Sequence, residues 1–406
     1  MKTQFLLLVG QAGYSVVPSI ARDPPGLRVS TSTTDLPGRQ GLTYPQPPRC
    51  VKTQFPLLPV RLFLYPYPGE ILEKHDASDT ITEDPLTRRN RPVIIPTQVV
   101  RDTHDRALAA LGELPAHARE GRAQNISSLI TLALKLDRID LVLPHRDALV
   151  EALQRDQDPD TGMWTHEDWH VPFVPVLQRV TALHVLDARP VHPVRELERI
   201  LSSDDALRDW VEGLNWSHPW GGATGAGHSL IAFTYSADDL GLITQAQLGI
   251  IRSIVETGRD DVYGAWHRDH LKTPEMLHLG GAFAQGIVYA RFGWPLDRVE
   301  GTVKMLEELQ LDTGSWNAKW PAGSADMDAA WMLDRYTRHD AALRRRATAM
   351  LERCADYTLA RLTDPEDSAK ASVGTHVNLL SVLRALFPDP NDDLPPWKFI
   401  MFGQLL

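Results

Sequence analysis

The sequence predicts an all-α fold in which six pairs of outer and inner helices close into an (α/α)6 toroid. First, a loop signature that combines Gly and Trp recurs along the chain, with its Trp residues at intervals of 46 to 56 residues. Such a period is typical of one repeated supersecondary unit, and its Trp positions are Trp164, Trp220, Trp266 and Trp316. Second, segments with one apolar stripe alternate with segments that are apolar on most faces, which indicates outer and inner helices. Third, no strand-like alternation appears in this half of the chain.

The chain divides into three predicted regions. Residues 1–95 are rich in Pro, Arg, Ser and Thr, a composition that indicates an irregular or disordered N-terminal arm. Residues 96–390 form the predicted toroid, and residues 391–406 a C-terminal tail. An open superhelix built from the same helix pairs is the alternative to a closed ring.

The helix pairs follow from the apolar pattern. Leu343, Ala347, Met350 and Cys354 form an apolar stripe on one face of an outer helix. Residues 279–289 and 377–387 are apolar on most faces and predict buried inner helices. The predicted outer helices begin near residues 100, 143, 193, 243, 298 and 341, and the predicted inner helices near residues 124, 171, 223, 275, 325 and 373.

Composition excludes several classes of protein. The chain has 406 residues and a net charge of −10, which argues against a nucleic-acid partner because phosphate binding needs clustered Lys and Arg. Two cysteines cannot form a disulfide framework. No apolar run reaches the length of a transmembrane segment. A weak signal-like pattern at the N-terminus is interrupted by Gln11 and Gly13, so a cytoplasmic location is expected and secretion is the minority interpretation.

One stretch resembles a known motif. The segment from Gly301 through Gln310 to Gly314-Ser-Trp316 resembles the QW repeat of terpenoid cyclases and protein prenyltransferase β subunits. The copy that ends at Trp164 is assigned Gln154 with an insertion after it. The Gln amide is expected to satisfy free backbone groups at helix ends, and the Trp to pack over the next helix start. The resemblance covers residues 100 to 390 and implies a central cavity for a small apolar or diphosphate-bearing substrate. It leaves open whether a second subunit is required, as in the protein prenyltransferases.

Polar residues at the predicted starts of the inner helices are the candidate site. Burying an ionisable group is costly unless it has partners or a task. The recurrence of such groups on successive inner helices therefore predicts an active centre; they are His170, His228, Glu275, His278, Asp326, Asp328, His376 and Asn378.

The resemblance to protein prenyltransferases implies a divalent metal, zinc or magnesium, as cofactor. Carried across, Asp326, Asp328 and His376 would be its ligands, with Asp328 standing where the family has Cys. His278 lies in a His-Leu-Gly-Gly segment similar to the family's His-Gly-Gly segment, which helps to hold the diphosphate. Glu275 begins the same segment, and Lys319 could supply a cation. His228 is a further predicted substrate contact.

The segment from Asp326 to Ala329 also resembles an incomplete Asp-x-Asp-Asp motif of class II terpene cyclases, with Ala329 in place of the last Asp. Asp328 would then be the protonating acid, which requires a raised pKa and a dry cavity. Asp326 and His278 complete the predicted catalytic set. Aromatic faces could stabilise carbocations, and the candidates are Trp164, Trp266, Trp316 and Trp331.

Three alternatives stay open. Each residue could be purely structural: an Asp near a helix start is commonly a cap, and a Trp in a turn commonly packs. A carbohydrate-active hydrolase, lyase or epimerase could use Tyr235 or Glu275 as acid and base with Trp164 as a platform. A toroid without catalytic activity could bind a small hydrophobe or a partner protein. The enzyme acting on an isoprenoid-like substrate, by cyclisation or prenyl transfer, is the favoured prediction.

Overall fold

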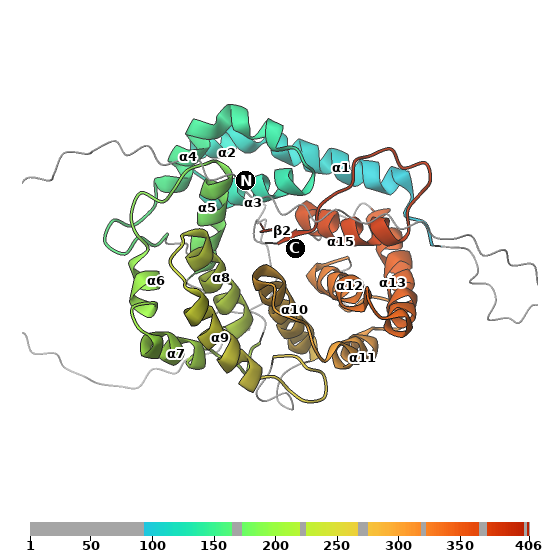
Figure 1. Cartoon of the computed structure of the whole chain (residues 1–406). Helices are drawn as coiled ribbons and strands as arrows, with labels where there is room; N and C mark the ends of the chain where they lie inside the picture. Colours follow the sequence, from blue (N-terminus) through green and yellow to red (C-terminus); the bar gives the residue numbers. More distant parts are fainter. Residues whose placement is uncertain are drawn as a thin grey trace, which may run out of the picture. The chain divides into compact units, whose positions relative to one another are not determined.

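The computed structural model describes residues 93–164, 173–219, 225–266, 275–317, 322–364, 372–401 and 404–405, and Figure 1 shows their helices. The predicted all-α class is confirmed for these residues. Their only strands are β1 (Ile400–Met401) and β2 (Gln404–Leu405), which pair antiparallel.

Six helices form an inner set whose members are buried on most faces. Each contacts the next along the chain, and the last also contacts the first, so the series of contacts closes (Figure 1). Their predicted starts lie at or within a few residues of the observed ones. The inner helices are α3 (Ala123–Lys135), α5 (Val174–Val185), α8 (Ala226–Asp239), α10 (Glu275–Phe292), α12 (Ser324–Thr337) and α15 (Val373–Leu386).

The outer helices alternate with the inner ones along the chain. They are α1 (Thr97–Gly112), α4 (Arg146–Gln154), α6 (Arg195–Ile200), α9 (Gln245–Thr257), α11 (Val299–Leu309) and α13 (Ala341–Leu362). Two outer segments continue into short helices that the periodicity did not separate, α2 (Leu114–Glu120) and α7 (Asp204–Glu212). Pro115 in the first turn of α2 explains the break after α1. Ser203 caps α7, because its side chain accepts a hydrogen bond from the N–H of Ala206. Before α4 the chain forms two 3-10 turns, η2 (Ile139–Leu141) and η3 (Leu143–His145).

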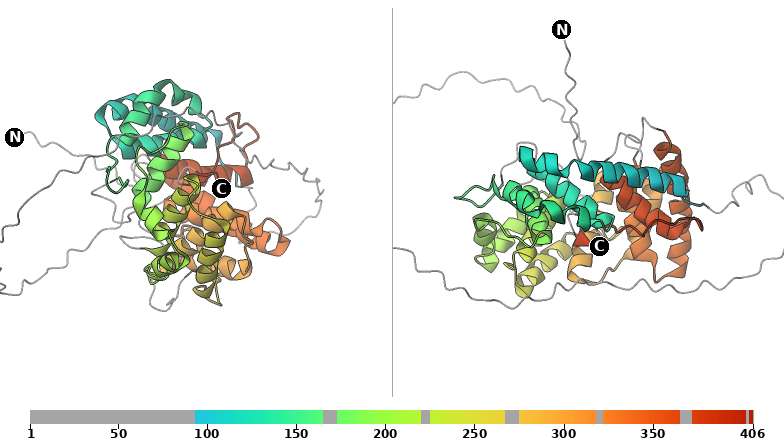
Figure 2. Two further views of the ribbon diagram at one scale, coloured as in Figure 1. Left: turned by 60° about the vertical axis from the view of Figure 1, so that its left-hand side comes forward. Right: turned by 90° about the horizontal axis from the view of Figure 1, so that it is seen from above.

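The first and last helices of the described residues lie side by side. Helix α1, in blue, contacts α15, in red (Figures 1 and 2). The N–H and hydroxyl of Thr97 donate to the carboxylate of Asp389 at 3.1 and 2.8 Å, and the N–H of Ile95 donates to the carbonyl of Phe387. Contacts so distant in sequence tie the two ends of the helical series together.

Three turns that lead from an outer to an inner helix share one geometry. Each has a Gly with a positive φ angle two residues before a buried Trp, and the glycines are Gly162, Gly264 and Gly314. A Cβ atom at Gly162 would lie 1.8 Å from the carbonyl oxygen of Pro193, and one at Gly314 would lie 2.3 Å from that of Arg353. Glycine is therefore required both by the backbone conformation and by the close approach of the following outer segment.

A long polar side chain closes each of these turns. Gln310 donates to the carbonyls of Gly314 and Met350 at 2.7 and 2.8 Å. In the first turn Gln157 makes the equivalent contacts, to Gly162 and His192 at 2.8 and 2.7 Å. The assignment of Gln154 to this position was wrong, because Gln154 donates instead to the carbonyl of Arg189.

In the turn before Trp266, Arg259 takes the place of Gln. Its Nε donates to the carbonyl of Gly264 at 2.9 Å. The spacing of Arg259, Gly264 and Trp266 equals that of Gln157, Gly162 and Trp164, and in both turns the outer residues of the triplet form an isolated antiparallel bridge. The substitution explains why this copy was hard to see in the sequence.

The C-terminal segment packs against the inner helices. Trp397, Phe399 and Ile400 are buried. The N–H of Ile400 donates to Oδ1 of Asn378, and Nδ2 of Asn378 donates to the carbonyl of Ile400, at 3.1 and 3.0 Å. The N–H of Lys398 donates to the carbonyl of Lys135 at the end of α3. This segment therefore belongs to the core of the helical region.

Candidate functional site

Asp326 is a structural link at the start of α12. Its side chain has no exposed surface. Its carboxylate accepts hydrogen bonds from the N–H of Trp316 at 2.7 Å and from the hydroxyl of Ser315 at 2.8 Å. Burial raises the pKa of Asp326 to about 6, although these hydrogen bonds act in the opposite direction. The carboxylate thus ties the turn after α11 to the first turn of α12.

Asp328 has a different environment, two residues further along α12. Its side chain is 2% exposed, and its Oδ1 has no hydrogen-bond partner. Burial, and then the nearby carboxylate of Asp326, raise the pKa of Asp328 well above that of an ordinary Asp. The neutral form of Asp328 is therefore more favourable than that of an ordinary exposed Asp.

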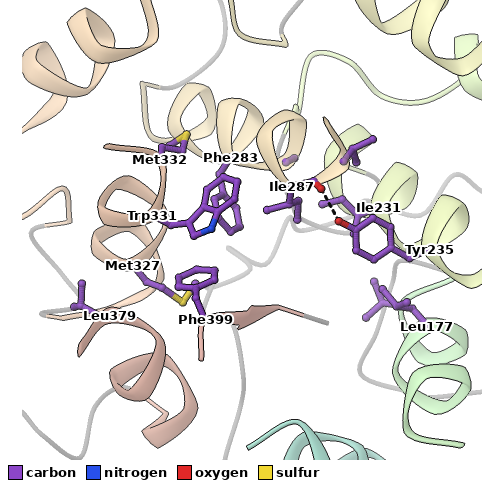
Figure 3. Close-up of a cluster of buried hydrophobic side chains, with 14 of the residues drawn as sticks. Leu177, Ile231, Tyr235, Phe283, Ile287, Met327, Trp331, Met332, Leu379 and Phe399 are labelled. Carbon is purple, nitrogen blue, oxygen red and sulfur yellow. Dashed lines mark hydrogen bonds between the residues drawn. The ribbon is translucent and has the colours of Figure 1, made fainter. Parts of the chain in front are cut away.

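The ring of Trp331 lies one helical turn beyond Asp328 and belongs to an apolar cluster. Figure 3 shows side chains of α5, α8, α10, α12 and α15 directed toward the interior, together with Phe399. Trp331 packs edge-on against Phe283, with 5.4 Å between the ring centroids, and its ring centroid lies 5.9 Å from that of Phe399. Asp328 is three residues before Trp331, a spacing that places two residues on neighbouring parts of one helix face.

His376, in the first turn of α15, is 1% exposed, and neither ring nitrogen has a hydrogen-bond partner. Burial lowers its pKa to about 4, and the charge of Arg106 on α1 contributes. The ring is therefore neutral at pH 7. Lys135, the last residue of α3, donates to the carbonyl of Gly374 in the same turn at 2.9 Å. The first turn of α15 thus contacts the last residue of α3. The starts of these two neighbouring inner helices are therefore offset along the helix axes.

The remaining polar candidates divide by what the structure describes. His278 in α10 is 7% exposed. His228 in α8 is half-buried, and burial lowers its pKa to about 4. Glu275 is the first residue of α10. Lys319, His170 and Trp220 lie outside the described residues.

The turn tryptophans make the contacts of packing residues. Trp164 and Trp316 are buried, and their indole N–H groups donate to the outer-helix carbonyls of Leu153 and Leu306, each at 2.8 Å. Trp266 is fully buried and packs edge-on against Trp216 and Tyr289. Their proposed contact with substrate stays a prediction, whereas Trp331 is the tryptophan that faces the interior cluster (Figure 3).

The next feature is the predicted metal site of Asp326, Asp328 and His376. Within the described ranges, no group of three His, Cys, Asp or Glu side chains is placed to hold a metal ion. The carboxylate of Asp326 is already engaged with Ser315 and Trp316. In the described part of the chain, Asp326, Asp328 and His376 therefore do not form a three-ligand metal site. The divalent-metal cofactor itself stays a prediction.

Two residues of the interior were missed by sequence reasoning. Phe399 falls in the predicted C-terminal tail, and nothing in the sequence pattern distinguishes Met327 between the two aspartates. Both lie beside Trp331 in Figure 3, and Met327 Sδ lies 3.4 Å from Nδ2 of Asn378. The aromatic content of the segment from Trp397 to Phe402 was the available signal, because exposed tails seldom carry large apolar residues.

No helix in the described part of the chain has the length and apolarity to cross a membrane. Comparisons with protein-family models, curated proteins and solved structures gave no match to this chain.

Proposed function

We propose that the helix pairs form an (α/α)6 toroid and that the chain is an enzyme acting on an isoprenoid-like apolar substrate. The closed series of contacts from α3 through α15 and back to α3 supports the ring. The recurring turns with Gly162, Gly264 and Gly314 support the repeat. Apolar and aromatic side chains directed inward support an apolar ligand (Figure 3).

The proposed chemistry depends on the environment of Asp328. A buried carboxyl group with an unpartnered oxygen and a raised pKa is a competent proton donor in a dry site. We therefore favour cyclisation started by protonation over metal-assisted prenyl transfer. The engagement of Asp326 in the α11–α12 turn supports the same choice.

In the proposed first step the O–H bond of Asp328 breaks as a C–H bond forms at one end of a substrate double bond. The electron pair of the double bond forms the new C–H bond, which leaves a carbocation on the adjacent carbon and a carboxylate on Asp328. The π faces of Trp331, Phe283 and Phe399 would stabilise the cation. Attack of a second double bond of the substrate on this cation forms the ring. Loss of a proton from the cyclised cation, directly or through water, to the Asp328 carboxylate gives the product and restores the acid.

The residues that a carbohydrate enzyme would need are less suitable. The hydroxyl of Tyr235 is buried and donates to the carbonyl of Ile287 at 2.7 Å, and burial raises its pKa. Trp164 is buried in its turn. These surroundings favour the apolar substrate over a sugar.

Infrared difference spectroscopy tests the proposal without a known substrate. The spectrum of the wild type minus Asp328→Asn at pH 7 should contain the carbonyl band of a protonated carboxyl group. The matched control is Asp334→Asn on the same helix, since Asp334 is ion-paired with Arg338 and Arg344 and should contribute only carboxylate bands. In parallel, the wild type but not Asp328→Asn should convert acyclic polyenes to cyclic products. A carboxylate band for Asp328, or full turnover by the variant, would overturn the assignment.

A further inference from the structure

A small depression lies at the start of α3, apart from the interior cluster. Its volume is about 250 Å³, and it is bounded by the turn before α3, the first turn of α3, Asp156 after α4, and Arg179 of α5. Nothing in the proposed chemistry uses these residues. The size suits a small ion or a small polar molecule rather than an isoprenoid chain.

Arg179 is the unusual member of this depression. Its side chain is 3% exposed, and its one hydrogen bond within the described structure runs from Nη1 to the carbonyl of Pro175, at 3.2 Å. Its Nε has no partner, and it forms no ion pair with any described residue. By contrast Arg122, also at this site, is paired with Glu120 at 2.8 Å. Burial lowers the pKa of Arg179 to about 10, and the charge of Asp156 acts in the opposite direction. A buried guanidinium that makes no direct ion pair is costly, so an anionic ligand in the depression would stabilise it.

The start of α3 offers further donors. Its N-cap residue is Arg122, and no side chain caps the helix. The N–H of Ala123 donates to the carbonyl of Gly121, while the N–H groups of Gln124 and Asn125 donate to no acceptor among the described residues. Free N–H groups and the helix dipole make such an end favourable for an anion.

We propose that this depression binds a small phosphate-class oxyanion, free or as a small ester, between Arg179 and the first turn of α3. The planar guanidinium suits phosphate oxygens, and the helix N–H groups supply the second set of donors. The carboxylate of Asp156 opposes a bare anion, and it accepts a hydrogen bond from a phosphate or ligand hydroxyl. The site is independent of the chemistry proposed for Asp328.

Titration of the full chain with inorganic phosphate against chloride at constant ionic strength tests this site. We expect saturable stabilisation in thermal denaturation. Arg179→Gln should weaken phosphate binding about tenfold or more, because a charge-assisted hydrogen bond is lost. Asp156→Asn should strengthen it severalfold, because an opposing charge is removed. The control Arg199→Gln removes an exposed arginine paired with Glu196 and should leave binding unchanged.

The two pocket variants have effects of opposite sign, which general destabilisation would not produce. If Arg179→Gln fails to fold, the exposed Asp156→Asn still decides the matter, since unchanged phosphate binding in that variant would overturn the proposal. An absence of saturable binding to phosphate would do so as well. Acetate that binds as tightly as phosphate would reassign the site to carboxylates. Glycerol phosphate that binds more tightly than inorganic phosphate would identify an ester as the ligand.

Discussion

The N–H of Trp316 donates a 2.7 Å hydrogen bond to the carboxylate of Asp326. This contact joins the turn after outer helix α11 to the first turn of inner helix α12, where Ser315 adds a second donor. This contact distinguishes two aspartates that look alike in the sequence, because the turn donates hydrogen bonds to Asp326 and not to Asp328.

Asp326→Ala should destabilise the fold by roughly 2–4 kcal/mol, because the buried N–H of Trp316 and the hydroxyl of Ser315 lose their acceptor. Urea denaturation measures the loss. Asp312→Ala, at an exposed position in the same turn, is the matched control and should change stability by less than about 0.5 kcal/mol. Equal effects of the two substitutions would contradict the linking role of Asp326.

Asp328→Asn should change how stability depends on pH. The folded pKa is raised above 3.8, so the folded state retains a proton that the unfolded chain has already lost. The stability contributed by this proton is present below about pH 4 and decreases as the pH rises toward the folded pKa. The unfolding free energy of Asp328→Asn relative to the wild type should therefore increase with pH, as followed by denaturation at several pH values. A difference that is constant across this range would argue against a buried acid.

His376→Gln should have the opposite effect. Burial lowers the folded pKa from 6.5 to about 4, so the unfolded chain binds a proton more readily than the folded protein. The contribution of His376 to wild-type stability should therefore rise between pH 4 and 6.5, by at most about 3 kcal/mol. The unfolding free energy of the variant relative to the wild type should decrease as the pH rises through this range. A profile identical to that of the wild type would mean that His376 titrates normally in the folded protein.

Gly314→Ala should be more damaging than Gly241→Ala. Both glycines have a positive φ angle. A Cβ atom added at Gly314 would clash with the backbone of Arg353, whereas one added at Gly241 would meet no other atom within 4 Å. The strained backbone alone costs about 1 kcal/mol, and the clash at Gly314 should add to it. Chemical denaturation of both variants measures the difference. Equal losses would show that the outer segments do not need to dock closely on the turn.

Phe399→Ala should destabilise the protein by about 3–5 kcal/mol, the usual effect of deleting a buried aromatic ring. Phe399 is 8% exposed and packs on Trp331, so the intrinsic fluorescence of the native state should change as well. Leu311→Ala, at a position that is 38% exposed, serves as the control. A small loss for Phe399→Ala would place the C-terminal segment outside the stable core.

Some features followed from sequence because they depend on local physics. The 3.6-residue periodicity located the six inner helices, since a helix buried on most faces must be apolar on most faces. The Gly and Trp of each turn were visible because their spacing is fixed within a few residues. The substitution of Arg259 for Gln was not, because the shared role is a hydrogen bond to Gly264 rather than a shared residue type.

The tertiary structure decided which polar residues are candidates for function. The sequence alone placed Asp326, Asp328 and His376 near the starts of inner helices and identified all three as unusual. Only the fold supplied partners for Asp326 and left Asp328 and His376 without them. Only the fold brought Phe399 to Trp331 and the end of α3 to the start of α15. Helix formation depends on neighbours in the chain, whereas the pKa of a buried group depends on atoms that arrive from distant segments, which local sequence does not encode.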